Sequence, residues 1–381
     1  NASSVMTSAA ENLAAFDIAM SIPAADLRAC VDHGLSGIGK HCPEAALPTA
    51  EWVLGARALE LGIAPQGQRS ANGTCRLLAC CDGWLGVNLA RGSDWELLNA
   101  WLATDQPLPD WQALAEAVAL RSGLALVGRG REIGLPLAFI GSEQVSDTSI
   151  NPLDCLPLML ADEDIKPVPR ILSHAKVVDL SALWAGPLCA QLLHRCGAQV
   201  TTVSSIRRPD GAQTGSPDFY RQLHAGHELL SLDFGDVAHR RQLAQRLMDA
   251  DVVIEASRPR ALVGLGLDRQ SLPIAKPQLW LSITAYGRTP PADQWVGFGD
   301  DVAASAGLLH WDEQHHPAFV GDAVADPLTG VYSALAVLDT MAQGDSGLLD
   351  FSMVNVARRC RQKIVGSGRL VTCPLQTPRQ C

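Results

Sequence analysis

An aspartate followed by a proline marks the stretch of this sequence best suited to covalent chemistry. Asp326 and Pro327 precede an apolar segment that ends near Met341. Because Pro327 disfavours helical geometry in the residue before it and favours it at its own position, we predict that Asp326 is the N-cap of a helix. Ordinary capping, with the charge stabilised by the helix dipole, is the simpler explanation. The functional explanation is an ionised carboxylate that attacks an activated acyl group.

A predicted strand–helix–strand unit over 176–203 sets the fold that must position such a carboxylate. A β-branched run leads into a turn of small residues, and an amphipathic helix follows until Gly197. Gly186 and Pro187 suit a helix start, with Pro187 at its first position, whose free N–H groups can face an anion. An ordinary turn between a strand and a helix has the same residues.

Strands and helices continue to alternate after this unit. We predict strands at 229–234, 251–255 and 279–284, and a helix over 236–249 that is capped by Asp236. This alternation predicts an α/β fold with a Rossmann-like, doubly wound and mainly parallel sheet. Ligands of such sheets bind beyond the carboxyl ends of the strands, which are expected here at 181–186, 204–208, 255–260 and 285–289.

Residues 1–150 are expected to form a smaller α/β lobe with a helical N-terminus. In this segment Asp82 and Gly83 separate two apolar runs, which is a strong hairpin signal, and 135–140 is predicted to be a short strand. The passage 151–170 is polar and contains prolines, so we expect a linker there. The Rossmann-like domain is then expected at 171–357, with a tail at 358–381.

The composition excludes several classes of function. The 381 residues carry a net charge of −10 and contain no Lys/Arg block, so nucleic acid and anionic membranes are not expected partners. Eleven cysteines occur without a CxxC pair or a Cys/His ligand spacing. We therefore expect no metal site, and reduced thiols in a cytoplasmic protein. No signal segment and no apolar run long enough to span a membrane is apparent.

Five stretches together resemble the family III CoA-transferases (CaiB/BaiF type), a group with formyl-CoA and carnitine-CoA transferases and the related alpha-methylacyl-CoA racemases. The stretches are VVDLSALWAGPLCAQLLHRCGAQV, ADVVIEASRPRALVGLGL, LSITAYGRTPP, VADPLTGVYSALAVL and SGLLDFSMVNVA, in family order within residues 171 to about 357. Residues 81–102 and 131–145 resemble the smaller lobe of that family, which follows the nucleotide fold in relatives. We therefore expect either a permuted lobe order or the remnant of a fused tandem whose first copy lost its nucleotide fold.

The resemblance implies a CoA-transferase that moves CoA between an acyl-CoA thioester and a small carboxylic acid. The aspartate that matches Asp326 would attack the thioester, giving a mixed anhydride and then an aspartyl-CoA thioester, while Asp322 is the rival nucleophile. Backbone N–H groups near Asp326 and Gly330 would stabilise the oxyanion. The resemblance also implies coenzyme A as a substrate, no permanently bound cofactor, and a homodimer.

The family pattern places CoA along the strand ends of the predicted sheet. The contacts would come from Trp184 and Ala185 in the first turn and from Ser257, Arg258 and Pro259 after the strand that ends at 255. A core aromatic at Trp184 and a solvated cap at Arg258 are the structural alternatives.

This chain departs from the family pattern at several positions, and some of the departures remove positive charges. It has Ser204 and Ser205 where relatives carry Glu and then often Arg or Pro, His227-Glu228 in place of Lys-Arg, and Ala256-Ser257 in place of Asn-Phe. The positive charge that CoA phosphates require would then come from other side chains. The candidates are Arg207, Arg208, Arg258 and Arg260.

Two other functions remain open. One is a catalytically weak or inactive relative that acts as a binding or assembly protein. The other is an acyl-CoA isomerase or racemase, but Phe298 stands where racemases place a histidine, and a phenyl ring cannot transfer a proton. Asp300 and Asp301, close by in sequence, are expected to be solvated carboxylates.

Overall fold

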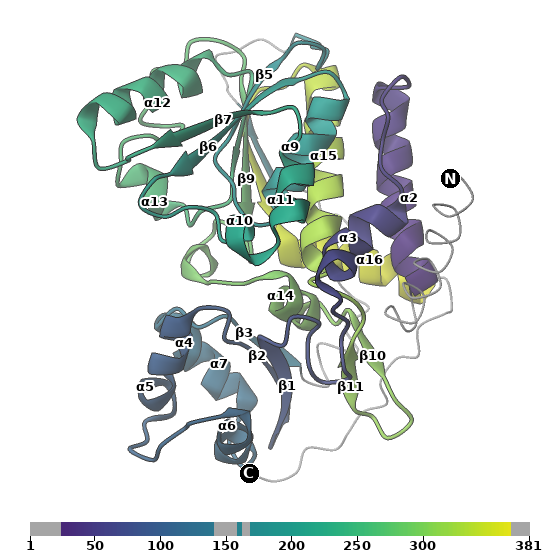
Figure 1. Cartoon of the computed structure of the whole chain (residues 1–381), viewed down its shortest axis with the longest axis vertical. Coiled ribbons are helices and arrows are strands. Elements are labelled where there is room, and N and C mark those ends of the chain that lie inside the picture. The colour runs from purple at the N-terminus through teal and green to yellow at the C-terminus, as the bar shows by residue number, and fades with distance from the viewer. Residues whose placement is uncertain (1–23, 141–157, 162–167, 367–381) are drawn as a thin grey trace, which may run out of the picture.

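A seven-stranded sheet forms the centre of the larger part of the chain in a computed structural model, which describes residues 24–140, 158–161 and 168–366 (Figure 1). The strand order is β4-β12-β9-β8-β5-β6-β7. Six strands run parallel, and β4 pairs antiparallel with β12. The strands are β4 (Leu158–Ala161), β5 (Lys176–Asp179), β6 (Gln199–Ser205), β7 (Glu228–Leu232), β8 (Val252–Glu255), β9 (Leu279–Thr284) and β12 (Gly347–Ser352).

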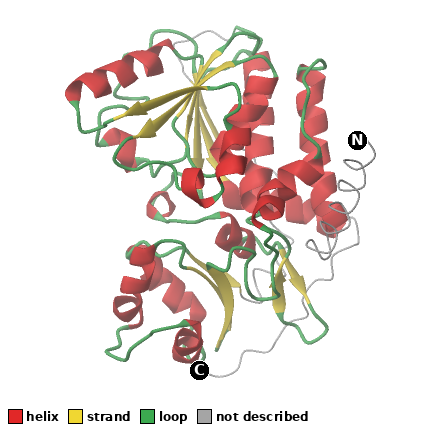
Figure 2. Cartoon of the chain, viewed as in Figure 1, coloured by secondary structure: helices red, strands yellow, loops and turns green. Residues whose placement is uncertain are grey.

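Helices cover both faces of this sheet (Figure 2). Successive strand residues point to opposite faces, so Val177 belongs to one core and Val178 to the other. Helices α12 (Val237–Asp249) and α13 (Arg260–Val263) pack on the second face. The first face is covered by α9 (Ala185–Arg195), α15 (Ala325–Gln343) and α16 (Met353–Gly366). Outside these helices, in the same core, lie α2 (Ala24–His41), α3 (Ala50–Leu61) and α11 (Pro217–Leu223), and α10 (Ala212–Gly215) precedes α11. The predicted doubly wound sheet is confirmed.

The strand–helix–strand unit also forms as predicted, with β5, α9 and β6 in order. Gly197, at φ 99°, follows the end of α9, where a left-handed residue commonly ends a helix. Pro187 differs from the prediction because it is the third residue of α9. Helix α12 begins after Asp236, whose carboxylate accepts hydrogen bonds from the N–H groups of Ala238 and His239.

Helices α2 and α3 pack with the large domain and not with the smaller lobe. Their buried side chains, such as Leu27 and Val53, lie in the same core as Leu188 of α9 and Val331 of α15. The expected lobe at 1–150 is therefore wrong for these two helices. Two other boundaries differ, because β4 lies within the expected linker at 151–170 and α16 continues past residue 357.

The smaller lobe is a three-stranded antiparallel sheet, β1-β2-β3, that lies below the larger sheet in Figure 1. The predicted hairpin joins β1 to β2, with Cys81 and Asp82 in the turn and Gly83 as the first residue of β2. One face of the sheet packs against helices of the lobe, and the other against α14 and the β10–β11 hairpin. The elements of the lobe are β1 (Cys75–Cys80), β2 (Gly83–Asn88), β3 (Leu137–Ile140), α4 (Gly92–Glu96), α5 (Leu98–Leu102), α6 (Trp111–Val118) and α7 (Gly123–Glu132). The segment 292–319 of the larger part supplies η2 (Ala292–Gln294), α14 (Gly299–Ser305), β10 (Leu309–Trp311) and β11 (Pro317–Phe319).

Two features bear on the environment expected for the protein. No helix in the described part of the chain has both the length and the hydropathy needed to cross a membrane. Cys30, Cys75, Cys189 and several other cysteines are free thiols, but Cys81 is disulfide-bonded, so the expectation that all thiols are reduced is wrong for Cys81.

Candidate active site

Asp326 is the second residue of α15 and does not cap it. Val324 occupies the N-cap position, and the backbone N–H of Asp326 donates to the carbonyl oxygen of Ala323 at 2.9 Å. Ala323 itself adopts a left-handed φ of 45°, which is uncommon for a residue with a side chain. The N-cap prediction is therefore wrong. Because no capping bond occupies it, the half-buried carboxylate of Asp326 is available for another role.

Burial raises the pKa of Asp326 to about 7. The positive charge of Arg57 opposes this effect, the negative charges of Asp301 and Asp322 add to it, and a hydrogen bond from the backbone of Gly299 opposes it. A carboxylate with a pKa near neutrality is a stronger base than a solvated one, and perturbed groups of this kind are concentrated at functional sites. Asp326 thus has the electrostatic properties of a reactive group.

Two further carboxylates, Asp300 and Asp301 of α14, are buried next to Asp326. Their exposed fractions are 3% and 0%, so the expectation that they are solvated is wrong. Asp300 accepts from the backbone N–H of Ala323 at 3.0 Å, and Asp301 accepts from Asn88 Nδ2 at 2.8 Å. Burial raises the pKa of Asp300 to about 8 and that of Asp301 to about 7. Like charges held this close favour keeping a proton on some of them.

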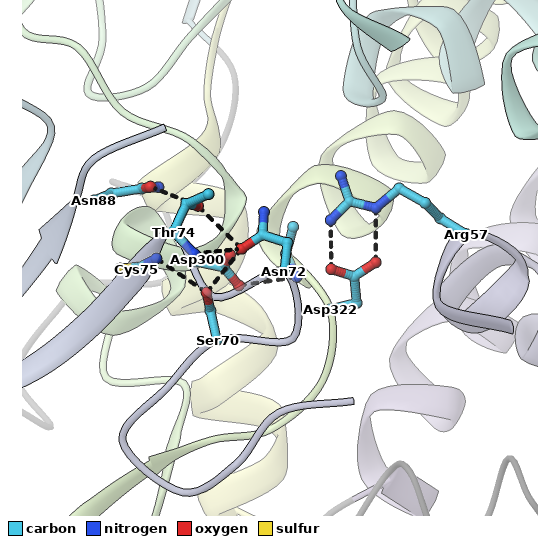
Figure 3. A network of polar contacts seen from close by, with 9 residues as sticks. Arg57, Ser70, Asn72, Thr74, Cys75, Asn88, Asp300 and Asp322 are labelled. Carbon is cyan, nitrogen blue, oxygen red and sulfur yellow. Dashed lines mark hydrogen bonds and ion pairs between the residues drawn. The ribbon is translucent and has the colours of Figure 1, made fainter. Parts of the chain in front are cut away.

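Arg57 is a site residue that the sequence did not indicate. It lies on α3, and its Nε donates to Asp322 Oδ2 at 2.7 Å while its Nη2 donates to Asp322 Oδ1 (Figure 3). The guanidinium also stacks on Trp184, with Cζ 4.8 Å from the ring centroid. The side chain of Asp322 is 1% exposed, and both of its carboxylate oxygens accept hydrogen bonds from Arg57. Its carboxylate is therefore less available for chemistry than that of Asp326.

The smaller lobe reaches the same site through a polar turn (Figure 3). Asn72 Oδ1 accepts from Ser70 Oγ at 2.9 Å and from the Thr74 backbone at 3.0 Å. The Thr74 hydroxyl lies 3.0 Å from Asn88 Oδ1, and Asn88 in turn donates to Asp301. This chain of contacts connects the turn in the smaller lobe to the carboxylates of α14.

The five residues predicted to contact CoA divide into two groups. Trp184 and Ala185 lie at the start of α9 and are buried, at 2% and 6% exposure. The Trp184 ring packs edge-on against Phe219 at 5.0 Å, so its immediate contacts are those of a core aromatic. Its Nε1 has no hydrogen-bond partner among the described residues. Ser257, Arg258 and Pro259 form a separate loop after β8, in which Arg258 is exposed.

Arginines gather around this loop. Burial lowers the pKa of Arg258, and the positive charges of Arg260, Arg91 and Arg208 lower it further. Arg208 follows β6 and Arg91 precedes α4 of the smaller lobe, so both parts of the chain contribute. Arg207 is already paired with Asp233, with Nη2 2.8 Å from Oδ2.

Gly330, expected near the oxyanion, lies six residues into α15. Backbone N–H groups at such a position bond within the helix. Gly330 serves instead as a close contact between helices, because a Cβ there would lie 2.8 Å from the carbonyl oxygen of Ala185.

The sequence profile of CoA-transferase family III matches residues 172–367. The chain belongs to this family. The match starts shortly before β5, includes Asp326, and ends after α16. It leaves out the smaller lobe and the helices α2 and α3 that supply Arg57.

Several curated CoA-transferases are similar to this chain. The succinate–glutarate CoA-transferase of Agrobacterium fabrum is 30% identical over 207 residues, which cover 49% of this chain and 51% of the relative. The human succinyl-CoA:glutarate CoA-transferase is 25% identical over 268 residues, 67% of this chain and 56% of the relative. The chain thus spans about half the length of the curated relatives it matches. A CaiB/BaiF family protein from Brucella suis superposes at a TM-score of 0.46 with 26% identity, covering 54% of this chain and 60% of that one.

Proposed function

We propose that this chain transfers CoA between an acyl-CoA thioester and a small carboxylic acid, with Asp326 as the nucleophile. The observation that carries the proposal is the half-buried, uncapped carboxylate of Asp326, whose pKa burial raises to about 7. Membership of CoA-transferase family III supports the reaction type. Trp184, Ala185, Ser257, Arg258 and Pro259 are the proposed CoA-binding residues.

The proposed chemistry needs only carboxylates and a thioester. One Asp326 oxygen attacks the thioester carbon, and the C–S bond breaks. This step releases CoA thiolate and forms a mixed anhydride between Asp326 and the donor acid. The thiolate then attacks the aspartyl carbonyl and releases the donor acid, which gives an aspartyl-CoA thioester. The acceptor carboxylate attacks the aspartyl thioester and expels CoA thiolate, which gives a second mixed anhydride. The thiolate then attacks the acyl carbonyl of that anhydride, forms the new acyl-CoA and releases the Asp326 carboxylate. Covalent catalysis of this kind divides one difficult exchange into easier steps.

Intact-mass measurement tests the proposal. The names of the relatives make succinyl-CoA as donor, with succinate and glutarate as acids, the first set of substrates to try. We expect an adduct heavier by one CoA less one water, which disappears in Asp326→Asn. Asp339, an exposed aspartate on the same helix that pairs with His41, gives a matched control, and Asp339→Asn should keep the adduct.

Two outcomes would replace this proposal. A wild-type protein that forms no adduct and gains no thermal stability with CoA would be a binding or assembly protein; the burial of Trp184 and Ala185 is the observation that favours this alternative. Exchange of the α-proton in deuterated water without CoA transfer would indicate an isomerase or racemase.

A homodimer and a cytoplasmic location are further parts of the proposal. The dimer is tested by light scattering over a dilution series, where a monomer at all concentrations would remove it. Fractionation of the source cells tests the location.

A further inference from the structure

Arg57 brings a positive charge from outside the family match to the group proposed to react. It lies near the C-terminal end of α3, and its partner Asp322 lies 265 residues later, four residues before Asp326. The arginine and aspartate side chains are 20% and 1% exposed. The guanidinium is held on two sides, by the carboxylate of Asp322 and by the Trp184 ring at 4.8 Å.

Stability alone does not account for this ion pair. Burying two charges costs several kcal/mol of desolvation, and apolar replacements for such pairs are often at least as stable. Two hydrogen bonds and the stacked ring fix the guanidinium in one position beside the start of α15. That position matters because Asp322 and Ala323 form the bend that leads into α15, whose second residue is Asp326.

The charges around Asp326 come from three parts of the chain. Arg57 on α3 favours the ionised form, as does the Gly299 N–H at the start of α14. Asp301 on α14 and Asp322 in the preceding turn favour the protonated form. If Arg57 lost its charge, Asp322 would remain as an uncompensated negative neighbour, and both changes would favour protonation of Asp326.

We propose that Arg57 is a positioning residue that keeps Asp326 ionised, and so sets the lower pH limit of the reaction. It does so from a fixed site between Asp322 and Trp184, without contact with the reacting acyl group. This inference rests on the proposed function only in taking Asp326 as the nucleophile.

The test compares the pH dependence of adduct formation in variants of the full chain. An opposite charge at close range commonly lowers a carboxyl pKa by about 1–3 units. In Arg57→Gln we therefore expect the midpoint of the pH profile to move up by about 1–3 units, with the rate recovering at high pH. Arg57→Lys keeps the charge and should return the midpoint close to that of the wild type.

Asp322→Asn separates an electrostatic role from a structural one. It breaks the same ion pair as Arg57→Gln, but it leaves Arg57 charged and removes a negative neighbour, so the midpoint should move down. Arg170 offers a matched control. It is half-buried and donates to the carbonyl oxygens of Pro277 and Asp345 before β9 and β12, at the opposite end of the sheet. Arg170→Gln should leave the midpoint unchanged.

If the midpoints of Arg57→Gln and Asp322→Asn stayed at the wild-type value, or moved in the same direction, the proposed role of Arg57 would be wrong. A second measurement keeps the result separate from the proposed function. The infrared difference spectrum between wild type and Asp326→Asn follows the ionisation of Asp326 without any substrate. If Asp326→Asn still formed the adduct, the proposed nucleophile would be wrong, while the infrared titration in Arg57→Gln would still decide the role of Arg57.

Discussion

The carboxylate of Asp326 lies against Gly299, the first residue of α14. A Cβ built on Gly299 would be 2.5 Å from Asp326 Oδ2 and 2.3 Å from the carbonyl oxygen of Ala323. Real Cβ atoms do not approach other atoms so closely, and one of these two obstacles is backbone. The absence of a side chain at Gly299 therefore allows α14 and α15 to begin side by side, with the carboxylate between them.

Gly299→Ala should displace the Asp326 carboxylate and slow adduct formation. A misplacement of about 1 Å can cost on the order of a hundredfold in rate, so we expect a loss of tenfold to a hundredfold. Gly92 is a matched control because it is also the first residue of a short helix, and no atom lies within 4 Å of a Cβ there. The rate is measured by intact mass over time. If the Gly299→Ala protein formed the adduct as fast as the Gly92→Ala protein, the steric argument would be wrong.

The elements that the sequence predicted correctly are those with local signals. Gly197 ends α9, Asp236 caps α12, and Asp82 lies in the turn of the β1–β2 hairpin, each through contacts within a few residues. The range of β9 agrees with the prediction of 279–284 to the residue. Five of its six residues are buried, and four of those five are apolar, as is typical of a strand covered on both faces. The doubly wound architecture followed from the alternation of such segments.

The candidate site could be predicted only in part, because its main contacts are not local. Arg57 and Asp322 are 265 residues apart, and Asn88 and Asp301 are 213 apart. Nothing near Arg57 in sequence distinguishes it from a solvated helix residue. Asp300 and Asp301 likewise resemble surface carboxylates until α14 packs between the small sheet and the helices α15 and α16. Their burial depends on the tertiary fold, which local patterns do not encode.

The buried carboxylates should make the protein less stable as the pH rises. Burial raises the pKa of Asp300 to about 8 and the pKa values of Asp301 and Asp326 to about 7, against about 3.9 in an unfolded chain. The folded state then binds more protons than the unfolded state between about pH 4 and 8, so the free energy of unfolding falls with rising pH. His227, whose pKa burial lowers to about 3, acts in the opposite direction below about pH 6.5.

The window from about pH 6.5 to 8 therefore isolates the effect of the carboxylates. Urea unfolding across this window should show a fall in stability that is shallower in Asp300→Asn, because the amide has no proton to lose. Equal slopes in the two proteins would show that Asp300 is already ionised at the lower pH.

Arg258 should bind the phosphates of CoA. It is exposed after β8, and the charges of Arg260, Arg91 and Arg208 are close enough to lower its pKa. A hydrogen bond to a charged group is worth about 1.5–3 kcal/mol, so Arg258→Ala should weaken CoA binding by about tenfold or more. Calorimetry with CoA and with pantetheine, which lacks the nucleotide, would show a loss for CoA only.

Arg207→Ala is the matched control for this prediction, because Arg207 is already paired with Asp233 and should contribute little to CoA binding. Equal losses in the two arginine variants would indicate a general effect of net charge. Equal losses for CoA and pantetheine would place Arg258 away from the phosphates.

Gly330→Ala should destabilise the fold through the contact between α15 and α9. The added Cβ would lie 2.8 Å from the Ala185 carbonyl oxygen and 2.9 Å from the side chain of Leu188. Overpacking of this kind costs about 1–3 kcal/mol and exceeds the gain from the better helix former. Gly128 lies within α7 with no atom within 4 Å of a Cβ, so Gly128→Ala should be neutral or stabilising. Urea midpoints that rank the two variants in the opposite order would refute the close packing of α15 on α9.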